Sequence, residues 1–378
     1  MKSNYIKNWF SDLWKVFTHE LKTVFSDGGF LIIFFVAGLG YPLLYGYIYS
    51  NGIVEDTPVA VVDLADCSES REFIREIDAT RELSVAYRCQ DMTEAQELFA
   101  ARKVNGIMYF PSDYGDKRAH EETAKLSIYA DMSCFLYYKN LLLGSENVML
   151  HHMNNDAITY TENLPYNRTF SYSIFFLSAV LMLIIQQVMF YGTTMLAGTA
   201  REENRSFATL PASLHGHGVS RVIFGRGLVY WLLFMAIGIY IATIVPAVIG
   251  LPQRGDYWDI MLMLVIFVLD CVVFSQFWSS FINKRETVFV LLLFISPICL
   301  FLTGFSWPSS AIPPFWKAFS WLFPSTFGCQ AFINLNTAGS TIASVRPLLH
   351  AMITQLAIYY ALSCVAMYVE QQVIKRNA

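Results

Sequence analysis

The side chains that could carry chemistry in this sequence do not form a recognisable enzyme site. The 378 residues contain no GxxxxGK[ST] loop, which would wrap backbone N–H groups around a phosphate, and no HExxH or GxSxG pattern. The histidine pairs 151–152 and 215–217 lack cysteine or carboxylate company at the spacing that zinc requires, and the cysteines form no CxxC pair. We predict that the chain is not an enzyme and binds no metal or cofactor itself.

A charge-dense segment between two apolar runs is the strongest candidate for a binding site. It reads REENRSFATLPAS from 201 to 213. A short amphipathic helix with charged rim residues and apolar anchors is suited to docking into a groove, where the charges orient it and the anchors give most of the affinity. The alternative is a solvated loop whose charges only fix topology. The residues of this candidate docking segment are Arg201, Glu202, Glu203, Arg205, Ser206, Phe207 and Leu210.

Polar residues lie inside two of the long apolar runs. Asp270 is near the middle of one run, where burial of an ionisable group costs several kcal/mol and marks a candidate functional residue. Substrate contact, proton coupling and a structural hydrogen bond remain alternatives for it. Gln186 and Gln187 are predicted to form hydrogen bonds between helices, and Gln186 is kept as a candidate for a transport path.

Composition shows what must position these residues. Hydrophobic residues make up 55% of the chain and charged residues 15%, against about 25% charged in soluble domains, so this is an integral membrane protein. The net charge of -4 gives no basic surface for nucleic acid. Runs of about 20 apolar residues can cross the bilayer. Six such runs predict an α-helical polytopic protein, at 30–49, 171–196, 222–249, 258–282, 287–305 and 348–369.

Lysine and arginine predict the orientation. They gather before the first run, at 201–221, at 284–285 and at 375–376, which fall on one side if all six runs cross. The positive-inside rule makes that side cytoplasmic, together with both termini. Because the preceding segment is long and acidic for a signal peptide, the first run is expected to be a retained anchor.

Residues 50–170 are then extracytoplasmic and read as an inserted α/β domain. Strand patterns at 59–64, 83–89, 104–110 and 125–130 alternate with helical patterns at 68–79 and 93–104, which predicts a βαβαββ order. A long amphipathic helix at 135–158 leads back to the second run. Cys67 follows the first predicted strand and Cys89 closes the second, so parallel pairing would bring both to the same sheet edge. A disulfide and two free thiols are both consistent with the sequence.

Two further segments flank the spans. Residues 1–29 place apolar side chains at helical spacing opposite Asp12 and Glu20, which predicts a helix in the plane of the membrane interface. Its apolar residues include Trp9, Leu13, Trp14, Phe17 and Leu21. Segment 303–345 is rich in aromatic residues and prolines, which predicts short re-entrant helices and an outer gate. The candidate gate residues are Phe305, Trp307, Pro308 and Pro324.

The order of these parts resembles the membrane subunit of an ABC-2 type exporter over nearly the whole chain. The matching motifs are VAVVDLADCSESREF, the cytoplasmic REENRSFATL and the segment containing LTGFSWP, IPP and LFPST. The resemblance implies that 197–221 is a coupling helix that docks on a separate ATPase. Here Arg205, Ser206 and Ala208 replace the Gly-Thr pair and glutamate of the commoner pattern, which puts its polar contacts in question.

The resemblance also implies the partners and the function. Two copies of an ATPase, which would hold ATP and Mg²⁺, and a second permease subunit, identical or similar, are expected. We predict export of an amphiphilic or hydrophobic substrate, drug-like or lipid-like, across a bacterial cytoplasmic membrane, with a periplasmic adaptor and outer-membrane channel as further partners to test. The alternative is a membrane-anchored sensor or assembly protein whose extracytoplasmic domain binds a partner without transport.

Overall fold

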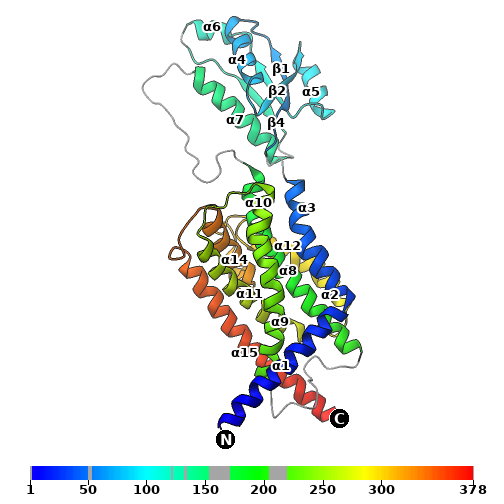
Figure 1. Cartoon of the computed structure of the whole chain (residues 1–378). Coiled ribbons are helices and arrows are strands. Elements are labelled where there is room, and N and C mark those ends of the chain that lie inside the picture. The colour runs from blue at the N-terminus through cyan, green and yellow to red at the C-terminus, as the bar shows by residue number, and fades with distance from the viewer. Residues whose placement is uncertain are drawn as a thin grey trace. The chain divides into compact units, whose positions relative to one another are not determined.

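The computed structural model describes residues 2–49, 53–120, 122–131, 134–152, 171–203 and 219–377. The chain divides into a membrane unit, Met1–Ser50 with Pro165–Ala378, and an α/β unit, Asn51–Leu164 (Figure 1). The α/β unit is inserted between the first and second long apolar helices of the membrane unit.

Among the described residues, five helices of the membrane unit are long and apolar enough to cross a membrane. They overlap five of the six predicted runs and are Gly28–Ile48, Phe176–Glu202, Val219–Ile249, Tyr257–Ser279 and Arg346–Gln372. The helix expected at 287–305 is α12, Thr287–Leu302, which has 16 residues. At 1.5 Å per residue it is about 24 Å long, shorter than the roughly 30 Å of hydrocarbon. The structure therefore supports five spans of full length, and a sixth crossing by the shorter α12 stays a prediction.

Proline and glycine shape several of these helices. The first span consists of α2 (Gly28–Ile32), the π-helical segment η1 (Ile33–Gly40) and α3 (Tyr41–Ile48), and the third consists of α9 (Val219–Ile239), η2 (Tyr240–Ile244) and α10 (Val245–Ile249). Pro42 and Pro246 begin the helices that follow the π-helical turns. Because proline has no N–H to donate, the preceding turn cannot keep its regular bonding. Helix α12 ends before Gly304, whose φ is +75°.

Helix α8 (Tyr172–Glu202) is the centre of the membrane unit. In its most apolar 18-residue stretch 89% of residues are buried, against 22% in the first span. It packs against α11 (Tyr257–Ser279), α12 and α14 (Pro324–Phe332). The other helices are α1 (Lys2–Ser26), α13 (Pro314–Ser320), the π-helical η3 (Ile333–Thr337) and α15 (Arg346–Asn377). A central helix with contacts on all sides is suited to carry movement along the bundle.

The α/β unit is built on a mixed four-stranded sheet in the order β2-β1-β3-β4. Strands β1 (Thr57–Asp63), β2 (Leu83–Cys89) and β3 (Gly106–Phe110) are parallel, and β4 (Ser127–Ala130) pairs antiparallel with β3. Helices α4 (Ser68–Asp78) and α5 (Met92–Ala100) connect the parallel strands. The predicted strands and helices are present, and the additional short helix α6 (Tyr114–Ala119) precedes β4.

Opposite faces of β1 support two separate cores. Val59 and Val61 pack with α4 and with α7 (Phe135–His152), whereas Ala60 and Val62 pack on the α5 side. Helix α7 turns a stripe of buried residues toward the sheet, and its Asn140 donates to the Val54 carbonyl at 2.7 Å. The alternation of one strand thus determines which helix covers which face.

Cys67 and Cys89 are both free thiols in the structure, which corrects the disulfide alternative. Cys67 Sγ caps α4 by accepting from the Ser70 N–H at 3.3 Å, and Cys67 packs on the core shared by α4 and α7. Cys89 belongs to the core on the α5 side. The thiols lie on opposite faces of the sheet because Cys67 is in the turn after β1, where the chain leaves the strand for α4.

Candidate functional site

Charged side chains join the helix ends at one end of the membrane unit, where α1 begins and α15 ends (Figure 1). At the end of α8, Arg201 donates to both carboxylate oxygens of Glu370 on α15 at 3.1 Å, and to the carbonyls of Ser279 and Ile282 after α11. Its side chain is only 13% exposed. This corrects the prediction that Arg201 lies on the rim of the docking segment, because its guanidinium is used to hold three helices together.

Arg285, which precedes α12, binds the same end of α8. Its backbone N–H donates to Glu202 at 3.0 Å, and its guanidinium donates to Thr199 Oγ1 and to both oxygens of Asp27 at 3.2–3.4 Å. Gly198 permits this approach, since a Cβ there would lie 2.8 Å from the Arg285 nitrogen. The basic residues near 201 and 284 are therefore neighbours in space.

The N-terminal helix α1 is held by two buried ion pairs with α9. Arg221 donates to Asp12, and Arg226 lies 3.0 Å from Glu20, which also accepts from the Tyr230 hydroxyl. Both carboxylates are buried. Helix α1 therefore turns its acidic residues inward, on a stripe with Val16 and Val24 at four-residue spacing, and packs close to α9.

This arrangement corrects the predicted face of α1. The sequence placed Asp12 and Glu20 on the polar, outward side, but they are the innermost groups because arginines on α9 face them. Trp14 is 63% exposed and stacks on the half-buried Phe17, while Phe10 and Phe25 are also exposed. Of the remaining predicted apolar residues, Trp9, Leu13 and Leu21 are half-buried.

Most of the candidate docking segment lies outside the described residues. Glu202 and Glu203 are exposed at the end of α8, and the chain is described again from Val219. Arg205, Ser206, Phe207 and Leu210 all fall in the interval between, so their docking role stays a prediction.

Asp270 is completely buried in the middle of α11. Neither carboxylate oxygen makes a hydrogen bond with any residue that the structure describes. The buried arginines of the membrane unit pair with other carboxylates. A carboxyl group without a polar partner at this depth is energetically costly, which keeps Asp270 a candidate functional residue.

Gln186 joins α8 to the short helix α14. Its Oε1 accepts from the backbone N–H of Ser325 in the first turn of α14, and its Nε2 points to Cys299 Sγ of α12 at 3.8 Å. Gln187 accepts weakly from Ser296 of α12 at 3.4 Å. Both glutamines thus make the contacts between helices that the sequence predicted, and Gln186 holds the start of α14.

The segment 303–345 contains α13, α14 and η3 rather than one straight helix. Pro324 begins α14 and is buried with the rest of that helix, so its irregular ends are covered by protein as a membrane environment requires. Phe305 is half-buried against Phe176, with ring centroids 6.1 Å apart. Trp307 and Pro308 are exposed in the turns before α13.

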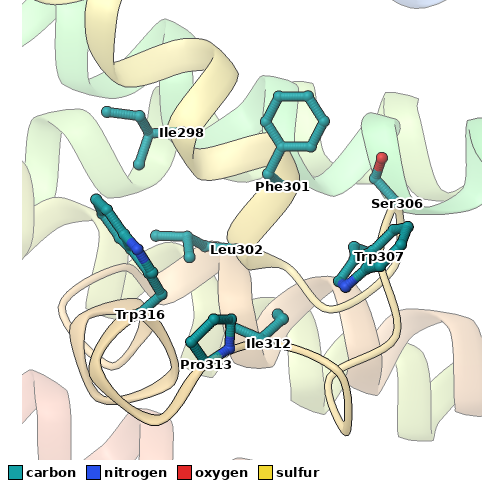
Figure 2. A pocket seen from close by; sticks show the side chains of 8 residues that line it. All are labelled: Ile298, Phe301, Leu302, Ser306, Trp307, Ile312, Pro313 and Trp316. Carbon is teal, nitrogen blue, oxygen red and sulfur yellow. The ribbon is translucent and has the colours of Figure 1, made fainter.

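A pocket of about 430 Å³ lies between the end of α12 and the start of α13. Figure 2 shows Trp307 and Trp316 on either side of Leu302, with Ser306 supplying the only hydroxyl. The remaining lining residues are aliphatic, aromatic or proline, namely Ile298, Phe301, Ile312 and Pro313. The walls are therefore suited to an apolar guest with at most one or two polar atoms.

The sequence matches the family model described as ABC-2 family transporter protein over residues 29–365. The chain belongs to the ABC-2 transporter family. No curated protein and no solved structure gives a significant match. The protein is accordingly a multi-pass membrane permease component without a catalytic centre of its own, and such permeases generally pair with ATPase subunits.

The structure of this ABC-2 permease adds residues that sequence patterns did not select. Asp12, Glu20, Arg221 and Arg226 form buried pairs, although only the arginine-rich start of α9 hinted at them. Among the candidate gate residues that we predicted from the sequence, only Trp307 lines the pocket. The rest of the lining comes from the end of α12, from the turns before α13 and, for Trp316, from α13 itself, and Gly304 with its positive φ lies between α12 and these turns.

Proposed function

We propose that this permease exports an amphiphilic or hydrophobic substrate, driven by a separate ATPase. The observation that carries the choice of cargo is the apolar pocket formed by α12 and α13, whose described lining contains no charged residue. An ion or a sugar would require several polar partners there, whereas an acyl chain or a flat aromatic molecule requires contact area. Two tryptophans on its walls provide that area and are the residue type that gathers at membrane interfaces.

In this proposal α8 connects the docking segment with α12 and α14, and α12 supplies part of the pocket lining. Helix α8 runs unbroken from Tyr172 to Glu202, contacts α14 through Gln186 and ends at the docking segment. Gln186 and Glu202 are 16 positions apart, which corresponds to about 24 Å of helix at 1.5 Å per residue. Because α8 is buried along most of its length, a displacement at its end would be passed to α14 as a movement of the helix.

The proposed assembly has two ATPase copies and two permease subunits, identical or similar. The docking segment and both termini face the cytoplasm in this proposal, and the α/β unit faces the opposite side of a bacterial cytoplasmic membrane. Clustered arginines at one helix end support this orientation through the positive-inside rule. A periplasmic adaptor and an outer-membrane channel would complete the route in a two-membrane cell.

The docking step is tested by copurification with the ATPase encoded beside the gene, followed by ATP turnover in lipid. The variant combines Phe207→Ala with Arg205→Glu. The matched control combines Phe135→Ala with Arg88→Glu, an exposed aromatic and an exposed arginine of the α/β unit. We expect the docking variant to lower recovery of the ATPase by roughly tenfold or more, because one anchor and one orienting charge are lost.

Equal recovery with both double variants would remove the docking role, and the absence of any associated ATPase would favour the sensor alternative. The cargo is tested separately with a hydrophobic cation and a lysolipid as probes of stimulated ATP turnover. Trp316→Ala should weaken stimulation by either probe. Trp258→Ala, an exposed tryptophan outside the pocket, serves as its control.

A further inference from the structure

Three potential metal ligands meet where two helices of the α/β unit pack together. Glu76 lies on α4, while His151 and His152 are the last two residues of α7. Glu76 Oε2 is 3.1 Å from His151 Nδ1 and 3.1 Å from His152 Nε2. One ligand atom from each of the three side chains lies within 4.8 Å of the others. The sequence had set the histidine pair aside for lack of a carboxylate, which the fold supplies from 75 positions earlier.

These separations are close to those around a tetrahedral ion. With Zn–N and Zn–O bonds of about 2.0–2.2 Å, neighbouring ligand atoms stand roughly 3.3–3.5 Å apart. The two glutamate–histidine distances need only widen by a few tenths of an ångström. The third distance, between the two imidazole nitrogens, is at most 4.8 Å and would have to close by about 1.5 Å or less. Rotation of the exposed His151 ring can supply that change without movement of the backbone.

Two observations distinguish this cluster from a surface ion pair. His152 Nε2 is buried and makes no directed hydrogen bond with a residue that the structure describes, although it faces Glu76 Oε2. The His152 ring also packs at 5.2 Å from the ring of Phe73, which holds its orientation. A buried nitrogen aimed at a carboxylate oxygen is satisfied by an ion placed between them.

The cluster is open to solvent on the His151 side and has a cation close to His152. Arg118 is the nearby cation, and its guanidinium donates to the backbone carbonyl of His152 at 3.4–3.5 Å. Because His151 is 75% exposed, the open side of the cluster can admit water as a fourth ligand.

We propose that Glu76, His151 and His152 form a binding site for a divalent transition-metal ion of the zinc class. Imidazole and carboxylate ligands suit this class better than Mg²⁺ or Ca²⁺, which prefer sites made of oxygen alone. The ion joins the end of α7 to α4, two elements that are far apart in the sequence. It therefore stabilises the α/β unit at the point from which the chain continues toward α8.

The test uses the full-length permease in detergent after removal of metals by a chelator. Zn²⁺ is titrated against a chromophoric competitor, and the equivalents bound per chain are counted. Glu76→Gln and His151→Ala should weaken one tight equivalent by roughly a hundredfold, since each removes a ligand. The controls are Glu72→Gln, an exposed carboxylate one turn earlier on α4, and His120→Ala, an exposed histidine after α6. Both should bind as the unaltered chain does.

Co²⁺ provides a second readout on the unaltered protein. We expect the visible absorption of a four- or five-coordinate cobalt ion at one equivalent, and its loss in His151→Ala. His151 is largely exposed, so this variant retains the fold. Equal Zn²⁺ affinity in Glu76→Gln and Glu72→Gln, or a cobalt spectrum unchanged by His151→Ala, would overturn the proposal. Neither result depends on ATPase docking or on the exported substrate.

Discussion

Buried carboxyl groups occur in two regions of the membrane unit, and their surroundings differ. Where α1 packs on α9, Asp12 faces Arg221 and Glu20 faces Arg226. In the middle of α11, Asp270 is equally buried but makes no hydrogen bond with the described part of the chain. All three carboxyl groups are buried to a similar degree. They differ in whether an arginine of the described chain faces them.

The difference indicates different reasons for keeping the charges. A buried ion pair contributes little net stability, because desolvation offsets attraction, but it specifies one arrangement of the two helices. The pairs at α1 and α9 thus determine where an otherwise mobile amphipathic helix lies. Asp270 makes no hydrogen bond with the described residues that would fix the position of a neighbouring helix. A functional role in the bundle interior is the reason we propose for it.

Replacing Arg221 is the most direct test of the comparison, because Arg221 forms the ion pair with Asp12. Arg221→Ala breaks the buried ion pair with Asp12, and we expect a loss of about 3–5 kcal/mol in unfolding free energy. Thermal unfolding of the purified permease would measure it. Lys22→Ala, an exposed change on α1, the helix that carries Asp12, is the control. The double variant Asp12→Asn with Arg221→Met should recover much of the loss. A single-variant loss no larger than that of Lys22→Ala would show that the pair does not hold α1.

The hydrogen bond between the uncharged Gln186 and Ser325 tests the same contrast between partnered and unpartnered groups, and its loss should cost less than the loss of an ion pair. Gln186→Leu removes the acceptor of the Ser325 N–H in the first turn of α14, so that a buried donor is left unsatisfied. We expect a loss of about 1–3 kcal/mol in the same unfolding measurement. Gln253→Leu removes an exposed bond to the Thr243 carbonyl and should cost much less. Equal losses would mean that α14 is held by apolar packing alone.

Asp270 should behave in the opposite way to Arg221. Asp270→Asn removes no hydrogen bond to a described residue, so its stability should stay within about 1 kcal/mol of the unaltered chain. Asp270→Leu should be neutral or stabilising, because it removes a costly buried polar group. ATP turnover of the permease–ATPase complex should fall in both variants if Asp270 serves transport. Destabilisation comparable to that of Arg221→Ala would instead assign Asp270 a structural partner.

The sequence allowed the parts of this fold that depend on local pattern to be predicted. Apolar runs located the five long spans, and alternation located the strands of the α/β unit. The length of α12 was overestimated, because the apolar run continues past Leu302 while Gly304 turns the chain. Local periodicity indicates which face of an element is hydrophobic, but it does not always show where that element ends.

The contacts that matter for function depend on pairing across long separations, which no local pattern contains. Asp12 meets Arg221 across 209 positions, and Glu76 meets His151 across 75. From sequence, Asp12 looked like an outward polar residue because a carboxylate is usually solvated. Asp12 can lie inward because the fold places the Arg221 guanidinium opposite its carboxylate. The same limit applied to the histidine pair, whose carboxylate partner lies on another helix.

The thiols of the α/β unit extend the contrast between partnered and unpartnered groups, with the smallest expected effect. Cys67 Sγ already has a role, since it accepts from the Ser70 N–H and caps α4. A serine hydroxyl is a stronger cap acceptor, so Cys67→Ser should change the unfolding free energy by at most about 0.5 kcal/mol, toward greater stability. Mobility on a non-reducing gel should be the same for this variant and the unaltered chain. A mobility difference that reducing agent abolishes would show that Cys67 does form a disulfide, which would require the turn after β1 to move to the α5 side of the sheet.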